Sequence, residues 1–190
     1  MLYIQKGQEP LFLTDFKKKY PSKTYDSKEF GEYRGQLNDI LRAEQKGLCA
    51  YCCGRIEERK AHNEHIEPQN PGKYTSNRSL DYTNIVASCN CLNTCGNKKE
   101  NHYDASQFVS PLDANCEDQF VYYADGTMEG NTYTIDLLNL NAYELKQARR
   151  AVIKSLQGLD KEMISMCYMN ENEEEYWPYY NVIKWYWNTL

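Results

Sequence analysis

Two pairs of cysteines constrain this chain more than any other feature of its sequence. Cys49 and Cys52 have two residues between them, and Cys89 and Cys95 have five. The first residues lack the long apolar run of an export signal, so we expect a reducing compartment, where such pairs are typical of zinc sites rather than disulfides. The spacing therefore predicts one structural Zn²⁺ held by all four thiolates, with no open position.

The other four cysteines carry weaker signals. Cys53 and Cys91 are close enough in sequence to replace a member of the nearer pair, so the choice within each pair stays open. Cys116 and Cys167 have no partner at metal-ligand spacing. We interpret these last two as ordinary cysteines.

Length and charge limit the kinds of partner. A chain of 190 residues with 41 % hydrophobic residues suffices for a small zinc-stapled domain with a helical appendage. No window approaches the roughly 18 apolar residues of a membrane span, so we expect a soluble, cytoplasmic protein with no membrane partner. The first hundred residues hold 16 Lys and Arg against 13 Asp and Glu, whereas the remainder holds 6 against 14. The front half is thus the half that can approach nucleic acid.

The periodicity predicts an α+β fold in three parts. Apolar residues spaced by three and four predict helices over 29–46 and 141–168, the second with Asn141 as its N-cap. Between them we expect a strand ending near Ile66, a polar loop over 69–79, a buried strand over 84–88, a short helix over 97–102, and a hairpin with a type I′ turn at Asp125-Gly126. The expected divisions are an N-terminal segment and helix (1–47), a zinc-stapled core (48–110), and a hairpin with C-terminal helices (111–190).

The polar residues of the core suggest phosphodiester hydrolysis. His65 follows a carboxylate at the end of a strand, and an imidazole held by a backbone carbonyl can take a proton from water as general base. Glu64 is the expected oxygen ligand of a catalytic Mg²⁺ or Mn²⁺, with Asn97 as the second. Asn84 is expected to bridge backbone groups and keep His65 aimed. Lys98 and Lys99 are candidates for contact with phosphate, and His62 is a candidate for an auxiliary metal ligand.

These motifs resemble the His-Asn-His (HNH) endonuclease family. The resemblance covers the stretch from Cys49 to about His102, and is carried by Cys49-x2-Cys52, Glu64-His65-Ile66-x-Pro68, Asn84-Ile85-Val86 and Cys95-Gly96-Asn97-Lys98-Lys99. It implies a ββα-metal core. Asn97 stands where histidine is frequent in the family, and Glu64 where aspartate is common; both replacements keep an oxygen able to bind a hard cation.

A narrower resemblance extends, loosely, over the whole chain. Three stretches look like the HNH nuclease subunit of Septu and retron-associated anti-phage systems: Tyr3-Ile4-Gln5-Lys6-Gly7, Glu44-Gln45-Lys46-Gly47-Leu48-Cys49-Ala50-Tyr51-Cys52 and Cys95-Gly96-x-Lys98-Lys99. That likeness implies DNA as the target and an SMC- or ABC-like ATPase as the partner. The aromatic segment 176–187 is expected to pack against the long helix, with docking of the ATPase as the second interpretation.

The resulting hypothesis is a metal-dependent DNA endonuclease whose C-terminal helices dock an ATPase. Two other functions use the same residues. One is a non-catalytic, zinc-stapled nucleic-acid-binding or adaptor module in which His65 is structural, and the other is a toxin that cuts RNA.

Overall fold

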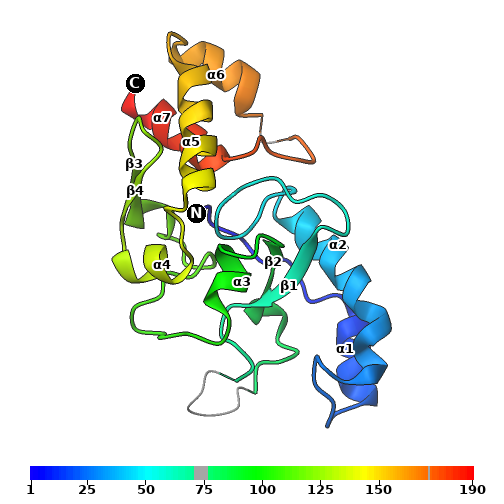
Figure 1. The fold of residues 1–190 in the computed structure, drawn as a ribbon. Coiled ribbons are helices and arrows are strands. Elements are labelled where there is room, and N and C mark those ends of the chain that lie inside the picture. Colours follow the sequence, from blue (N-terminus) through cyan, green and yellow to red (C-terminus); the bar gives the residue numbers. More distant parts are fainter. Residues whose placement is uncertain (71–76, 171) are drawn as a thin grey trace.

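The chain folds into seven α-helices and two small antiparallel sheets within the residues that the structure, a computed structural model, describes: 1–70, 77–170 and 172–190. Figure 1 shows the first hairpin and α3 in the lower half of the molecule, α1 and α2 on one flank, and α5, α6 and α7 at the opposite end. The α+β class expected from the sequence is confirmed. The helices are α1 (Leu11–Lys19), α2 (Arg34–Glu44), α3 (Cys95–Lys99), α4 (Thr132–Leu137), α5 (Tyr143–Leu156), α6 (Lys161–Tyr168) and α7 (Tyr180–Thr189).

The first sheet is a hairpin of β1 (Ala61–His65) and β2 (Ile85–Cys89). His65 pairs with Ile85 and Glu64 with Val86, so the two strands lie in register along their whole length. Every residue of β2 is buried, because its apolar run is covered by α2 and α3. The loop expected over 69–79 joins these strands, and its residues 71–76 lie outside the described part of the chain.

The helix predicted over 29–46 is shorter than expected. A 3-10 turn, Lys28–Tyr33, precedes α2, which ends at Glu44. Gly47, with a φ of +73°, follows this end, as a glycine beyond a helix C-terminus commonly does. Leu37 and Leu41 are fully buried and place α2 against the hairpin.

The second sheet pairs β3 (Phe120–Tyr122) with β4 (Met128–Gly130), which confirms the second hairpin. The predicted type I′ turn is wrong, because that turn needs positive φ at both central residues and only Gly126, at +86°, has it. The carbonyl of Lys146 leaves no room beside this glycine, since a Cβ there would lie 2.0 Å from that oxygen. The turn is therefore packed directly against α5.

The long helix predicted over 141–168 is two helices, α5 and α6. Gly158, with a φ of +86°, interrupts it, and Asp160 then caps α6 by accepting a hydrogen bond from the Met163 amide at 2.8 Å. Asn141 is not the N-cap of α5. Its side chain instead bridges the backbone amide and carbonyl of Met128, at 2.9 and 2.8 Å. The Asn141 side chain thus forms hydrogen bonds with the backbone at the start of β4 instead of capping α5.

The C-terminal helix α7 belongs to the core. This confirms the expectation that the aromatic segment 176–187 packs against the preceding helices. Val182 and Ile183 are 0 % and 2 % exposed, and α7 packs on both α5 and α6. Among the described residues, no helix has the length and apolar content needed to cross a membrane.

The rear half is tied to the start of α3 by two hydrogen bonds. The Cys95 amide donates to the Leu138 carbonyl at 2.9 Å, and the Asn139 side-chain amide donates to the Asn93 carbonyl, also at 2.9 Å. The segment that follows α4 is therefore bonded to the turn in which α3 begins.

Candidate metal centre and active site

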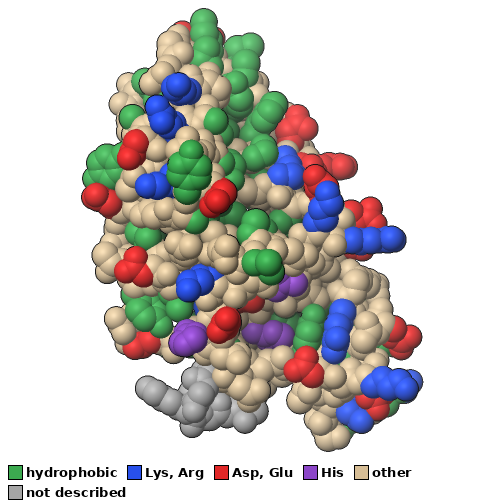
Figure 2. Space-filling model, in the orientation of Figure 1, with side chains coloured by type: hydrophobic (Ala, Val, Ile, Leu, Met, Phe, Trp, Pro, Cys, Tyr) green, Lys and Arg blue, Asp and Glu red, His purple; other side chains and the backbone are tan. Residues whose placement is uncertain are grey.

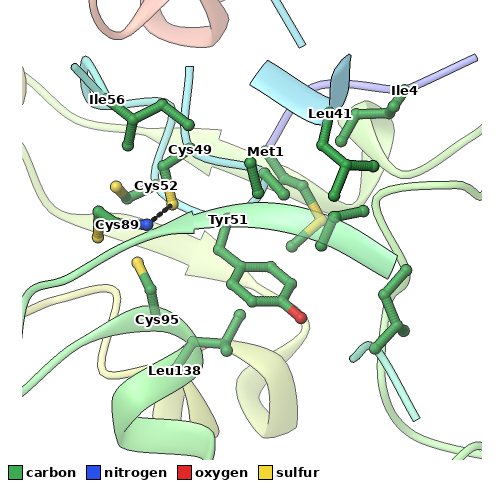
Figure 3. Packing of buried hydrophobic residues seen from close by; sticks show 14 of the residues in the cluster. Met1, Ile4, Leu41, Cys49, Tyr51, Cys52, Ile56, Cys89, Cys95 and Leu138 are labelled. Carbon is green, nitrogen blue, oxygen red and sulfur yellow. Dashed lines mark hydrogen bonds between the residues drawn. The ribbon is translucent and has the colours of Figure 1, made fainter. Parts of the chain in front are cut away.

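Four cysteine sulfurs form a compact cluster beside the first hairpin. Cys49 and Cys52 come from the turns after α2, Cys89 from the end of β2, and Cys95 from the start of α3. All four are buried, their sulfurs lie within 4.8 Å of one another, and Figure 3 shows the four side chains converging. A tetrahedral ion with Zn–S bonds of about 2.3 Å holds its sulfurs roughly 3.8 Å apart, so the cluster fits Zn²⁺.

Backbone amides support negative charge on this cluster. The Cys89 amide donates to Cys49 Sγ at 3.4 Å, and the Gly54 amide donates to Cys52 Sγ at 3.4 Å. Burial raises the pKa of the Cys49 thiol, but hydrogen bonds from the other three thiols outweigh it and hold that pKa well below its usual value. The cluster thus stabilises negative charge on Cys49 by itself, and a bound cation would stabilise the remaining thiolates.

The structure selects among the remaining cysteines. Cys53 is buried outside the cluster, where burial raises the pKa of its thiol to about 11, and Cys91 is exposed. Neither replaces a member of the predicted pairs. Cys116 is buried among apolar residues and Cys167 is exposed, and neither belongs to the cluster.

Strand β1 sends its polar side chains to two opposite faces. His62 and Glu64, two residues apart, share the face toward α3, whereas His65 points to the other face. Figure 2 shows histidine and acidic side chains near one another on the side of the molecule that carries this hairpin. The side chains of Glu64 and His65 therefore lie on opposite faces of β1, so the structure does not bring them together on one face.

His65 is held in the way expected of a general base. Its Nε2 donates to the Ser79 carbonyl at 2.9 Å, which leaves the lone pair on Nδ1, and the described residues supply no hydrogen-bond partner for Nδ1. The ring stands edge-on to Tyr25, with centroids 4.9 Å apart. Burial lowers the pKa of His65 below 6.5, so the imidazole is neutral at pH 7.

Asn84 occupies the bridging position predicted for it. Its side-chain oxygen accepts from the Glu67 amide at 2.9 Å, and its side-chain amide donates to the Glu67 carbonyl at 3.0 Å and the Arg78 carbonyl at 3.3 Å. These bonds fix the chain just after β1 against the segment that carries Ser79. Asn84 therefore sets the position of the carbonyl that holds His65.

The Glu64 carboxylate has internal partners on both oxygens. Lys99 Nζ lies 2.9 Å from Oε1, the Tyr51 hydroxyl donates to Oε1 at 3.3 Å, and His62 Nε2 lies 3.3 Å from Oε2. Burial raises the pKa of Glu64, but His62 and Lys99 outweigh burial and hold it below the usual value. The carboxylate is therefore ionised at pH 7.

Lys99 is not a phosphate contact. Its side chain is 1 % exposed, because it is enclosed beneath α3 with its ammonium on Glu64 and on the His65 carbonyl, at 3.0 Å. Lys98, the neighbouring residue, is exposed. Of the two lysines expected to touch phosphate, only Lys98 is accessible to one.

The structure does not bring the Asn97 side chain to Glu64. The amide of Asn97 donates to the Cys91 carbonyl at 3.3 Å, and the residue of α3 that faces Glu64 is Gly96. A Cβ at Gly96 would lie 2.6 Å from Glu64 Oε2 and 2.7 Å from His62 Nε2. Glu64 and Asn97 thus do not fit the role of a shared pair of Mg²⁺ ligands.

Sequence reasoning gave little weight to the residues that surround Glu64. His62 was detectable, because a His-x-Glu spacing in a strand places both side chains on one face. The Asn90 side-chain oxygen, 3.0 Å from His62 Nδ1, and the buried Lys99 carry no such local signal, since only the packing of α3 brings them to the strand.

No protein-family model matches the chain, and no curated protein matches it.

Proposed function

We propose that this protein is a metal-dependent endonuclease of the HNH type that hydrolyses DNA phosphodiester bonds. The observation that carries the proposal is His65, a neutral imidazole at the end of β1 whose Nε2 is fixed on the Ser79 carbonyl while Nδ1 keeps its lone pair. Support also comes from the order of elements, since a hairpin followed by a short helix and joined by four thiolates agrees with the expected ββα core.

In this proposal His65 Nδ1 takes a proton from the attacking water, and Asn84 positions the imidazole through the 78–84 segment. A divalent cation on Glu64 supplies positive charge for the phosphate and the departing oxygen when it is bound. Asn97 is not part of that ligand set, because its amide is bonded to Cys91. The Zn²⁺ of the four cysteines has a structural role only.

The proposed substrate is DNA, and the proposed partner is an SMC- or ABC-like ATPase of an anti-phage defence complex. Because α7 is part of the core, the docking surface is placed on α6 and the segment after it, where Met163, Met166 and Trp177 are 50 %, 78 % and 53 % exposed. Exposed apolar side chains in an acidic region suit a partner protein better than a phosphate backbone. Changing Met166 to Glu should abolish co-purification with the ATPase, and unchanged co-purification would remove α6 from the interface.

The nuclease proposal is tested with zinc-loaded protein, supercoiled plasmid and an RNA of similar length, each with Mg²⁺ or Mn²⁺. Wild-type protein should nick the plasmid, and His65→Ala should reduce the rate at least 100-fold, a typical contribution of general-base catalysis. The matched control is His102→Ala, which changes an exposed histidine. Equal cleavage by His65→Ala would remove His65 from the mechanism, and cleavage of RNA alone would favour the toxin.

A second function, a non-catalytic nucleic-acid-binding or adaptor module, is favoured by one observation. The Glu64–Lys99 ion pair is buried, with side-chain exposures of 10 % and 1 %, and a carboxylate neutralised in this way resembles a structural residue. The cleavage assay, together with a gel-shift experiment, separates the two functions. An adaptor binds DNA in the gel-shift experiment and leaves the plasmid intact with every cation.

A further inference from the structure

The face of β1 opposite to Glu64 borders a surface hollow of about 480 Å³. The hollow lies between β1 and the start of α2, and Tyr25, from the segment between α1 and α2, forms part of its wall. Asn63 joins the strand to α2, because its side chain accepts a hydrogen bond from Asn38 at 2.8 Å and donates to the Arg34 carbonyl at 2.9 Å. Ligand pockets in proteins commonly measure about 300–1,000 Å³, so a nucleotide-sized ligand fits this hollow.

His65 lies on the same face of β1 as Asn63, two residues further along the strand. Side chains two residues apart in a strand point to one side, and their Cα atoms are separated by about 6.6 Å. Tyr25 connects the two places, because it lines the hollow and its ring stands edge-on to the His65 imidazole, with centroids 4.9 Å apart. A ligand in the hollow is therefore a neighbour of any group bound at His65.

Arg34 brings a positive charge with unused hydrogen-bond donors to the hollow. Its Nη2 donates to the Tyr25 carbonyl at 2.8 Å, and its guanidinium carbon lies 5.0 Å from the centre of the Tyr25 ring, so the planar group is held in place. Its Nε is enclosed without a partner, and among the described residues no acceptor is bonded to Nη1. The side chain is 40 % exposed, which leaves its terminal nitrogens to an anionic ligand.

The carboxylates around the hollow do not satisfy Arg34. Asp39 and Glu58 line the hollow, and each is paired with another arginine at 3.3 Å. Asp26 lies 3.9 Å from Arg34 Nη2, which is too far for a hydrogen bond, and its side chain is 71 % exposed. A loose and exposed ion pair contributes little, so a phosphate oxygen can take its place.

Asn38 adds a fixed hydrogen-bond acceptor to the same hollow. The residue is buried, and the bond from its Nδ2 to Asn63 sets the orientation of the amide. Among the described residues no donor is bonded to Asn38 Oδ1, and the residue lines the hollow. A phosphodiester has no donor to offer, whereas bases carry amino groups and the sugars of RNA carry a 2′-hydroxyl. The donors of Arg34 and the acceptor of Asn38 together match a nucleotide.

We propose that the hollow between α2 and β1 is a nucleotide subsite, in which Arg34 binds a phosphodiester oxygen and Asn38 Oδ1 accepts a hydrogen bond from the base or sugar of the same strand. The position of this nucleotide beside the bond cut at His65 rests on the proposed nuclease function. Binding of the strand in the hollow requires no cleavage and no cation on Glu64.

The test measures the fluorescence anisotropy of a short single-stranded DNA with zinc-loaded protein and no added divalent cation, at several salt concentrations. Arg34→Gln should weaken binding about 10-fold, because a charge-assisted hydrogen bond is lost. The slope of log affinity against log salt should fall by about 0.7, the value for one phosphate of a single strand. Arg34→Lys should lose affinity but keep the slope, since it retains the charge without the planar fork. Arg150→Gln, at an exposed arginine of α5, is the matched control and should bind as the wild type does.

A second variant tests the acceptor. Asn38→Ala should weaken binding about 5-fold and leave the salt slope unchanged, because it removes a neutral group. Circular dichroism and zinc content verify that each variant is folded. The same measurement with an RNA of equal length shows whether a 2′-hydroxyl strengthens binding.

The outcomes separate this subsite from the nuclease proposal. Equal affinity and salt slope for Arg34→Gln and the wild type, or no binding of any oligonucleotide at low salt, would overturn the subsite. Displacement of the DNA by an equal concentration of inorganic phosphate would also overturn it, because the hollow would then hold a simple anion. Binding that depends on Arg34 in a protein that cuts no DNA would overturn the nuclease function and leave the subsite in place.

Discussion

The ammonium of Lys99 lies 2.9 Å from a carboxylate oxygen of Glu64, in a part of the molecule where Lys99 is 1 % exposed. This ion pair joins α3 to β1 from within. Removing one member of a buried pair leaves the other charged without a partner, which is far more costly than loss of a surface ion pair.

Replacing Lys99 by Met should therefore destabilise the protein by about 3–5 kcal/mol, as expected for a broken buried ion pair. Lys98→Met is the matched control, because Lys98 is exposed on the same helix, and it should change stability by less than about 0.5 kcal/mol. Urea unfolding followed by circular dichroism measures both values. Equal stability of the two variants would contradict the structural role of the pair.

The four-cysteine cluster should be required for folding of the first hairpin. Cys95→Ser removes one of four ligands and should abolish zinc binding, because a structural site with three thiolates holds the ion weakly. Cys167→Ser, at an exposed cysteine outside the cluster, should retain a full equivalent of zinc. Zinc content by mass spectrometry and thermal unfolding with and without a chelator test this expectation.

Replacement by alanine should destabilise the protein to different degrees at two glycines that have the same φ angle. Gly126 and Gly158 both have a φ of +86°, but an added Cβ meets the Lys146 carbonyl at 2.0 Å in the first case and nothing within 4 Å in the second. Gly158→Ala should cost about 1–2 kcal/mol, the price of a left-handed residue with a side chain. Gly126→Ala should cost more than that, because α5 and the turn must separate. Similar melting temperatures for the two variants would be inconsistent with this packing.

Replacing Asn84 by Ala should destabilise the protein more than replacing Asn97 by Ala. Asn84→Ala leaves the Glu67 amide without its side-chain acceptor, so we expect a loss of about 1–3 kcal/mol for the uncompensated group. Asn97 donates a single, longer bond of 3.3 Å, and its replacement by Ala should cost less than about 1 kcal/mol. Chemical unfolding of both variants measures these losses, and a larger loss for Asn97→Ala than for Asn84→Ala would contradict the prediction.

Acid should weaken the 78–84 segment through Asp81. Burial raises the pKa of Asp81, but hydrogen bonds from Thr83 and the ion pair with Arg78 outweigh burial and keep that pKa below 3.8. A carboxyl with a depressed pKa stabilises the folded state above its unfolded pKa, and this contribution disappears as the pH falls through the folded value. Wild-type protein should therefore be more stable than Asp81→Asn at pH 7, and the difference should shrink below pH 3.8. A constant difference across this range would contradict the assignment.

The sequence was sufficient to predict those features of the structure whose signal lies in short stretches of the chain. Cysteine spacing identified the four clustered thiols, and the apolar run at 84–88 identified β2, because each pattern needs only neighbouring residues. Gly158 was present in the printed sequence, but a continuous apolar stripe concealed the break that it makes between α5 and α6. Helical periodicity alone cannot tell two aligned helices from one.

The surroundings of Glu64 could not be predicted because they depend on where α3 begins. The helix starts at Cys95 rather than at Asn97. Gly96 and Lys99 are three residues apart and share the face of α3 that meets the strand, whereas Asn97 lies about 100° from Gly96 and is bonded to the Cys91 carbonyl. The start is set by the Leu138 carbonyl, which comes from a distant part of the chain.

The bond between the Cys95 amide and the Leu138 carbonyl also has a mechanical consequence. The C-terminal end of α4 is bonded to a cysteine of the cluster at 2.9 Å, and the Asn139–Asn93 bond lies beside this contact. A displacement of the segment after α4 would therefore move Cys95 directly, so the position of this segment and the spacing of the four sulfurs are linked.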